Sequence, residues 1–249
     1  MDENKNNENK EGLYTNEIKE YLEKTQNKMM VEESLPAFWR NEEDTQTTEN
    51  QGFHVVEDED KIGDKTLADY LALPDDVRVE LIDGVFYDMS APRYDHARII
   101  TELLSELRDY VKKNNGPCCP FTAPADVQLD KDDKTVVQPD IFVVCDVTKI
   151  NGARLFGAPD MVVEIVSPSN WRTDVEKKKK KYERAGVREY WMIFPEKLKI
   201  TVCYFEGKEA PVDYTFHDKI PVRIWGGKCV IDFEEIYQVA KYFIDQNTK

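Results

Sequence analysis

The chain has 249 residues, of which 41% are hydrophobic and 11% aromatic, enough to bury one good core, so we expect one folded domain. Its formal charge of −15 at pH 7 excludes the broad basic surface of a tight duplex binder. Residues 1–63 hold 17 acids and 7 bases (17 − 7, net −10), and residues 64–249 hold 32 acids and 27 bases (32 − 27, net −5). Nucleic-acid binding would therefore need a local basic patch and a metal ion.

The cysteines are odd in number and show neither CxxC nor Cys/His zinc spacing, which favours a reduced compartment over a disulfide framework and argues against zinc. They are Cys118, Cys119, Cys145, Cys203 and Cys229. The first residues are polar, and no apolar run approaches the roughly 18 residues that span a bilayer. We expect a cytoplasmic protein with no membrane association.

The N-terminal quarter of the chain is predicted to be an acidic extension. Residues 1–12 and 41–61 are polar and almost free of core residues, so they should be disordered. Between them, residues 13–30 have helical spacing of apolar side chains, which suits either a tethering helix or a partner-docking motif. We therefore expect an extension over 1–63 and a folded domain over 64–249.

The domain should begin with a short helix at 66–71 and a strand at 77–81. Asp83-Gly84, followed by the apolar residues 85–87, is a strong signal for a β-hairpin with a two-residue turn. Glu80 faces away from its apolar neighbours in the first strand, so it is either a solvent-side acid or a supporting residue of a site.

A long amphipathic helix should follow, capped by Asp95 and closed near Gly116. Its apolar stripe consists of Ile99, Ile100, Leu103, Leu104, Leu107, Tyr110 and Val111. His96 falls on this inward face, which favours a satisfied core histidine over a neighbour of a catalytic site.

Residues 125–129 are predicted to form a strand, with 130–133 as its turn. The acids of this turn do not form a calcium loop, because the EF-hand glycine and final glutamate are absent. Asp140 then follows a proline and precedes an apolar run at 141–145. Because proline is tolerated at the head of a strand, Asp140 should lie at a strand mouth.

Glu164 interrupts the apolar run at 161–166, which is typical of an interior strand. An unpaired buried carboxylate costs several kcal/mol, so Glu164 should face a cation, a base or a water-filled cleft. A capping-box pattern at 173–176 starts the next helix, and Gly186 ends it.

That helix carries five consecutive lysines, and a projection at about 100° per residue places Lys178 on its inward face, bracketed by Val175 and Tyr182. The ammonium of Lys178 should therefore point toward the strand of Glu164. The lysines expected to be solvated are Lys177, Lys180 and Lys181.

Further strands are predicted at 189–194, 199–205, 213–216, 221–224 and 229–231, before a terminal helix capped by Asp232. This order of helices and strands indicates an α+β or mixed α/β domain with a central sheet.

The order of these motifs resembles the Uma-two-type restriction endonucleases, a branch of the PD-(D/E)XK nuclease superfamily. The resemblance spans about residues 64–240. The matching residues are Thr66–Tyr70, Glu80–Gly84, Met89, Pro92, His96, Pro139-Asp140, Pro159–Ser169, Asp174, Lys178, Tyr182, Gly186-Val187 and Glu189–Trp191.

This resemblance implies a restriction-endonuclease-like central mixed sheet flanked by helices, in which Asp140 and Glu164 hold Mg²⁺, or Mn²⁺, for hydrolysis of DNA. Val166 occupies the position of the superfamily's lysine, so the basic role passes to Lys178 on the following helix. Glu80, His96 and Tyr182 are the expected supporting residues.

Two alternative functions are weighed at this point, and the oligomeric state is a separate open question. A glycosidase using the two acids lacks the aromatic sugar platforms expected beside them. A catalytically inactive nuclease-fold module that binds nucleic acid or a protein partner fits the acidic balance and the missing strand lysine. A homodimer is suggested only because many nucleases cut two strands as dimers.

Overall fold

A computed structural model describes residues 62–74, 76–89, 91–129, 133–167 and 177–247. The chain divides into two units, 1–51 and 52–249, and every described residue belongs to the second. The predictions for residues 1–61, for the turn residues 130–132 and for the capping box at 173–176 therefore lie outside the described part. Within the described part, no helix is long and apolar enough to cross a membrane.

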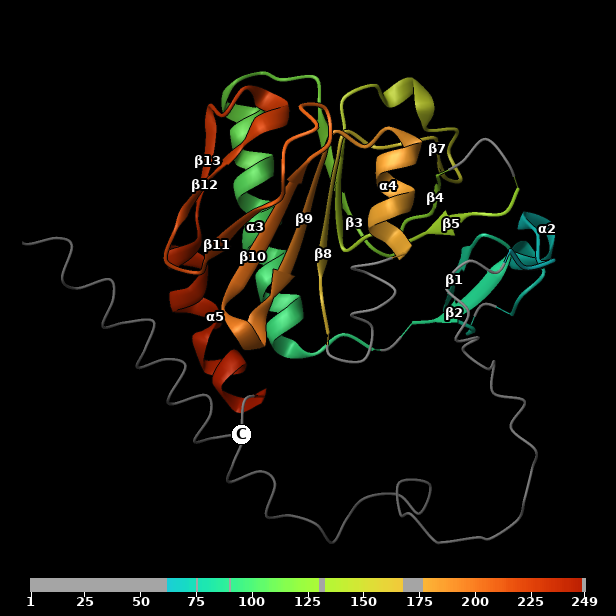
Figure 1. The fold of residues 1–249 in the computed structure, drawn as a ribbon, viewed down its shortest axis with the longest axis horizontal. Coiled ribbons are helices and arrows are strands. Elements are labelled where there is room, and N and C mark those ends of the chain that lie inside the picture. Colours follow the sequence, from blue (N-terminus) through green and yellow to red (C-terminus); the bar gives the residue numbers. More distant parts are fainter. Residues whose placement is uncertain (1–61, 75, 90, 130–132, 168–176, 248–249) are drawn as a thin grey trace, which may run out of the picture. The chain divides into compact units, whose positions relative to one another are not determined.

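The fold is built around a six-stranded mixed sheet, with a second sheet of five short strands and a separate two-stranded hairpin (Figure 1). The six-stranded sheet has the order β11 (Val212–Thr215), β10 (Lys199–Tyr204), β9 (Glu189–Phe194), β8 (Met161–Ile165), β6 (Ile141–Val144) and β3 (Cys119–Thr122). The five-stranded sheet has the order β2 (Val85–Asp88), β1 (Val79–Ile82), β5 (Val136–Val137), β4 (Val127–Gln128) and β7 (Leu155–Phe156). The separate hairpin pairs β12 (Lys219–Val222) with β13 (Cys229–Asp232). The predicted α/β class is confirmed. One central sheet was predicted, whereas the strands form a six-stranded and a five-stranded sheet besides the hairpin.

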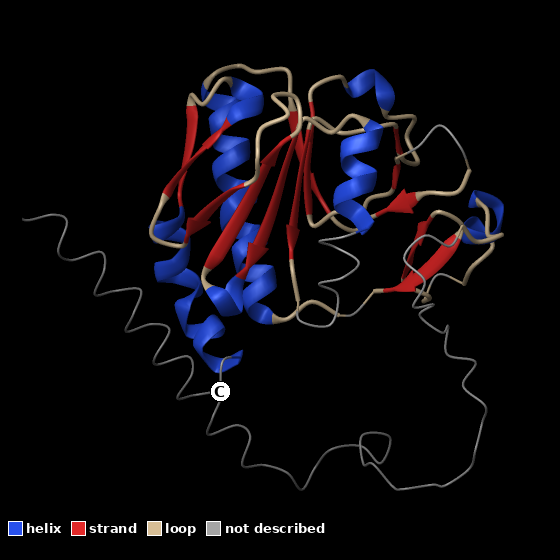
Figure 2. Ribbon diagram, in the orientation of Figure 1, coloured by secondary structure: helices blue, strands red, loops and turns tan. Residues whose placement is uncertain are grey.

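Two different layers cover the six-stranded sheet (Figure 2). Val163 of β8 packs in the cluster formed by α3 (Tyr94–Lys113) and α5 (Phe233–Asn247), whereas its neighbour Val162 packs with Tyr182 of α4 (Lys179–Ala185). Since β8 also lies between β6 and β9, all five of its residues are buried. Glu164 therefore sits on an interior strand, as predicted.

Helix α3 forms where the apolar spacing predicted it. Ile99, Leu103 and Leu107 recur at four-residue intervals and are fully buried. Asp95, however, is not the cap: the N-cap is Arg93, and Asp95 lies buried in the first turn. Its carboxylate accepts from the guanidinium of Arg93 at 3.0 Å and from the N–H of His96 at 2.9 Å. An acid in the first turn of a helix accepts from unpaired N–H groups, as an N-cap acid does. The sequence pattern of a first-turn acid therefore resembles that of an N-cap acid.

The β1–β2 hairpin confirms the two-residue turn. Asp83 and Gly84 have φ of 51° and 76°, the positive values that this kind of turn requires at both positions. The N–H of Gly63 donates to the carbonyl of Asp83 at 2.7 Å, so the chain before α2 (Leu67–Leu71) packs on the turn.

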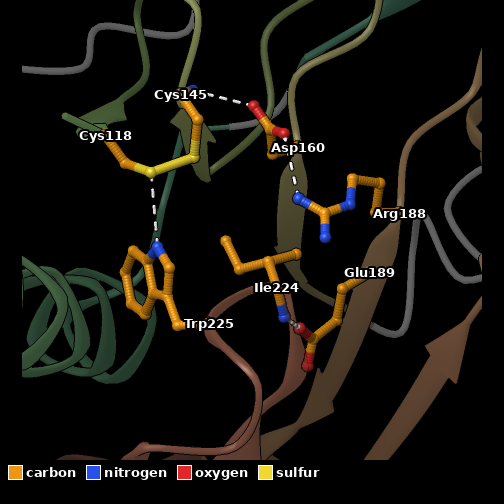
Figure 3. The surroundings of a disulfide bond; sticks show 7 residues. All are labelled: Cys118, Cys145, Asp160, Arg188, Glu189, Ile224 and Trp225. Atoms are coloured by element: carbon orange, nitrogen blue, oxygen red, sulfur yellow. Dashed lines mark hydrogen bonds and ion pairs between the residues drawn. A yellow bond between two sulfur atoms is a disulfide. The ribbon is translucent and has the colours of Figure 1, made fainter. Parts of the chain in front are cut away.

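A disulfide joins Cys118 to Cys145 (Figure 3). The expectation that the cysteines are reduced is wrong for this pair. Cys119 lies opposite Val144 in the antiparallel pairing of β3 with β6. Cys118, directly before β3, therefore lies opposite Cys145, directly after β6. The N–H of Cys145 also donates to the Asp160 carboxylate at 2.7 Å. Cys spacing cannot reveal a strand register, so the sequence carried no signal for this bond.

Candidate active site

The register of β6 and β8 brings Asp140 and Glu164 to one end of the sheet. The two strands are antiparallel, with Ile141 opposite Val163, so the residue before the first and the residue after the second are neighbours. The N–H of Ile165 donates to Oδ2 of Asp140 at 2.7 Å, which fixes this carboxylate at the mouth of β6. The strand-mouth acid and the interior acid therefore belong to one site.

Glu164 is 3% exposed. Its Oε1 accepts from the ammonium of Lys178 at 3.1 Å and from the hydroxyl of Tyr182 at 2.7 Å. Burial of Tyr182, together with the negative charge of Glu164, raises the pKa of this phenol well above its usual value. The hydroxyl consequently remains a proton donor to the carboxylate over the whole physiological range.

Lys178 also contacts a second acid. Its Nζ lies 2.7 Å from Oε2 of Glu80, which is 4% exposed. The solvent-side alternative for Glu80 is thus wrong, and one buried ammonium faces two buried carboxylates. Lys178 lies in a π-helical turn, Lys177 and Lys178, that leads into α4. The predicted direction of its side chain toward β8 agrees with the contact to Glu164.

The other lysines of the run follow the projection only in part. Lys180 is exposed, as expected. Lys177 instead donates to the hydroxyl of Tyr87 at 2.9 Å, and Lys181 pairs with Asp83. The prediction of a solvated face fails for these two because the β1–β2 hairpin packs beside α4, which a projection of one helix cannot foresee.

His96 reaches the site from the first turn of α3. Its Nε2 lies 3.0 Å from Oδ2 of Asp140, and its buried Nδ1 has no hydrogen-bond partner among the described residues. The favoured interpretation as a satisfied core histidine is therefore wrong, and the alternative of a site neighbour describes its position.

The sequence did not single out Gln138 as part of the site. Its backbone N–H donates to Oε1 of Glu80 at 2.8 Å, and its side chain bonds to Tyr70 and Asp126. The available signal was its position two residues before Asp140. Tyr70 lay in the matching segment Thr66–Tyr70, but its contact with Asp126 could not be foreseen, because it depends on how the second sheet folds.

The two acids suit a hard divalent cation. Oδ1 of Asp140 makes no hydrogen bond to a described residue, whereas Oδ2 is engaged by Ile165 and His96. No cluster of three or more His, Cys, Asp or Glu side chains suited to a metal occurs in the described ranges. Mg²⁺ commonly takes one or two carboxylates and completes its shell with water, so a two-acid site fits it chemically.

A mixed sheet between helical layers, with two acids on neighbouring paired strands and a lysine beside one of them, makes this an α/β protein with a candidate active site. The Uma2 family, described as "Putative restriction endonuclease", matches residues 67–222. The chain belongs to this family, which supports a nuclease-like function.

A solved structure supports the same fold. The crystal structure of "a putative nuclease belonging to DUF820" from Anabaena variabilis aligns with a TM-score of 0.60 and 20% sequence identity. The alignment covers 70% of this chain and 98% of that one. No match was found among the curated proteins.

Proposed function

We propose that this protein is a metal-dependent endonuclease that hydrolyses phosphodiester bonds in DNA. The observation that carries the proposal is the contact of Glu164 with Lys178 beside Asp140, at the end of paired strands in a chain of the Uma2 family. Oxygen ligands and an adjacent ammonium are the groups that phosphodiester hydrolysis needs.

Asp140 and Glu164 would hold Mg²⁺ or Mn²⁺, which when bound would lower the pKa of a water molecule and offset charge on the phosphate. Ile165 and His96 hold Asp140 from the side of Oδ2, which keeps its other oxygen directed away from these partners. Tyr182 orients Glu164 through its hydroxyl. The role of Lys178 is to stabilise negative charge that develops on the phosphate oxygens.

The test is cleavage of supercoiled plasmid DNA with Mg²⁺, with Mn²⁺ and with a chelator. We expect metal-dependent cleavage by the wild type and none by Asp140→Ala or Glu164→Ala, with both variants still folded. Glu183→Ala is the matched control, since Glu183 lies on the exposed face of α4. Wild-type rates in both site variants would overturn the proposal.

The inactive-module alternative predicts a different outcome. Val166 stands where the superfamily places its lysine, and the domain expected over 64–249 is acidic (32 acids, 27 bases). The inactive module is favoured if the protein cleaves DNA with neither metal and millimolar Mg²⁺ or Mn²⁺ leaves its melting temperature unchanged. A metal that binds the folded state must raise that temperature.

A further inference from the structure

Lys178 has two carboxylate partners, and they are not equivalent. Glu164 also accepts from Tyr182 and is a candidate metal ligand, whereas Glu80 lies on a different sheet and contacts the ammonium at 2.7 Å rather than 3.1 Å. A lysine on a helix has a long, flexible stem, and it keeps one position only where packing and partners hold it. Glu80 would therefore remain a partner of Lys178 if Glu164 bound a cation.

Glu80 is itself fixed by the backbone. Its Oε1 accepts from the N–H of Gln138 at 2.8 Å, and its place in the centre of β1 is set by pairing opposite Tyr87. Each carboxylate oxygen of Glu80 therefore has its own donor, one from the backbone of Gln138 and one from Lys178.

A closed triangle of hydrogen bonds fixes Gln138 in turn. Its Nε2 donates to Oδ1 of Asp126 at 2.9 Å and to the hydroxyl of Tyr70 at 3.1 Å, and this hydroxyl donates to the same Oδ1 at 2.9 Å. Burial and the adjacent Asp126 raise the pKa of Tyr70, so its hydroxyl keeps the proton that it donates. We call Tyr70, Asp126 and Gln138 the amide triangle.

The amide triangle joins three separate elements at one point. Tyr70 comes from α2, Asp126 directly precedes β4, and Gln138 follows β5. Gln138 is also followed by Pro139, whose ring restricts φ, and then by Asp140. The triangle is thus connected to Lys178 through Glu80, and to Asp140 through the single intervening residue Pro139.

We infer that Glu80, held by the amide triangle, is the positioning residue for Lys178. In the superfamily pattern the lysine would stand at position 166, directly after β8, where this chain has Val166. Here the lysine comes from the following helical segment, and Glu80 holds it in place. The inference rests on the proposed function for its consequence in cleavage, but the position of the lysine can be measured without any cleavage.

The direct test is competitive labelling of the full chain with acetic anhydride, with acetylation of Lys178 compared with that of the exposed Lys180 by mass spectrometry. Lys178 should be protected in the wild type. In Asp126→Ala its labelling should rise about tenfold, the factor expected when a buried hydrogen bond is lost. Asp126→Asn should restore protection, because both donors of the triangle share one oxygen that the asparagine carbonyl can replace.

Tyr70→Phe covers the case in which Asp126→Ala does not fold, since it removes only one oxygen atom. Its matched control is Tyr204→Phe, which removes a hydroxyl that strand β10 carries and that donates to Glu206. Glu80→Gln should expose Lys178 most. Unchanged protection of Lys178 in both Tyr70→Phe and Glu80→Gln would overturn the inference.

Cleavage kinetics separate positioning from a purely structural role. Loss of the triangle should lower kcat with little change in KM, and the effect of Tyr70→Phe should disappear in a Lys178→Ala background. Equal effects in both backgrounds would contradict an action through the lysine. If the wild type cuts no DNA, the proposed function fails, while the labelling result still decides the position of Lys178.

Discussion

Lys178 and Lys180 are two residues apart and lie in opposite environments. Lys178 is 4% exposed and pairs with two acids, whereas Lys180 faces solvent. We expect Lys178→Ala to lower the rate of plasmid cleavage about a hundredfold, as the loss of one transition-state charge contact would. Lys180→Ala should cleave at close to the wild-type rate.

Both variants should be compared at the same salt concentration, with thermal unfolding as a control for folding. Lys178→Ala leaves Glu80 and Glu164 without their shared cation, so its melting temperature is needed to separate instability from lost chemistry. Equal cleavage by the two variants would refute the role given to Lys178.

Asp95 provides a stability prediction with a defined pH dependence. Burial raises the pKa of this carboxyl, but the hydrogen bonds from Arg93 and from the N–H of His96 outweigh it, and the pKa lies below the usual 3.8. A depressed pKa in the folded state stabilises the fold above pH 3.8, and this contribution is lost as the pH falls through the folded value.

We therefore expect Asp95→Asn to lower the free energy of unfolding by about 2 kcal/mol at pH 7. The difference from the wild type should narrow as the pH falls below 4. Urea unfolding of both proteins between pH 7 and pH 3 measures it, and a difference that stays constant over this range would contradict the assignment.

The strand positions of Asp140 and Glu164 could be predicted because each stood in a strand pattern of its own. Among the partners of the lysines, Glu164 could be predicted for Lys178, but Glu80, Tyr87 and Asp83 could not. Whether Glu80 faces solvent depends on Lys178, and whether Lys181 is solvated depends on Asp83, yet each of these pairs joins segments far apart in the chain. A local periodicity describes one element and carries no information about the element packed against it.

At the scale of elements, the turn of the β1–β2 hairpin is a point where two backbone segments approach closely. A Cβ atom on Gly84 would lie 2.4 Å from the carbonyl oxygen of Gly63, and φ at Gly84 is 76°. Gly152 has a similar φ of 88°, but a Cβ atom there would meet nothing within 4 Å. A comparison of alanine substitutions at these two glycines therefore separates the cost of backbone strain from the cost of steric contact.

Gly152→Ala should cost about 1 kcal/mol from the left-handed conformation alone. Gly84→Ala should cost about 3 kcal/mol, because the backbone at Gly63 must also move. Chemical denaturation of the two variants measures the difference. Equal losses would show that the approach of Gly63 to the turn contributes nothing.

The elements themselves were predicted well where turn chemistry is local, as at Asp83-Gly84, and where apolar spacing is long, as in α3, although the cap of α3 was assigned to the wrong residue. The two sheets and the disulfide were not predicted. Strand order depends on pairings such as β1 with β5 and β6 with β8, and sequence alone does not specify which strands become neighbours.

At the scale of the whole molecule, the described hydrophobic clusters lie entirely between residues 67 and 244. We predict that deletion of residues 1–60 leaves a folded domain with a melting temperature close to that of the full chain. The truncated protein should bind nucleic acid at least as well, because the deletion removes a segment that is net acidic.

Calorimetry and a DNA-binding titration of the two proteins at equal ionic strength provide the measurement. An insoluble or unfolded truncation would show that the extension packs on the domain, contrary to the predicted boundary near residue 63.

The bridge that Lys178 makes between Glu80 and Glu164 has a consequence for synthesis on the ribosome. Both acids leave the exit tunnel before the lysine, since the chain grows from its N-terminus. Until α4 emerges, the two carboxylates have no shared cation, and their burial side by side is opposed by charge repulsion and desolvation. The proposed site would therefore assemble late in translation, and an unfinished chain would carry both acids without the lysine that pairs with them.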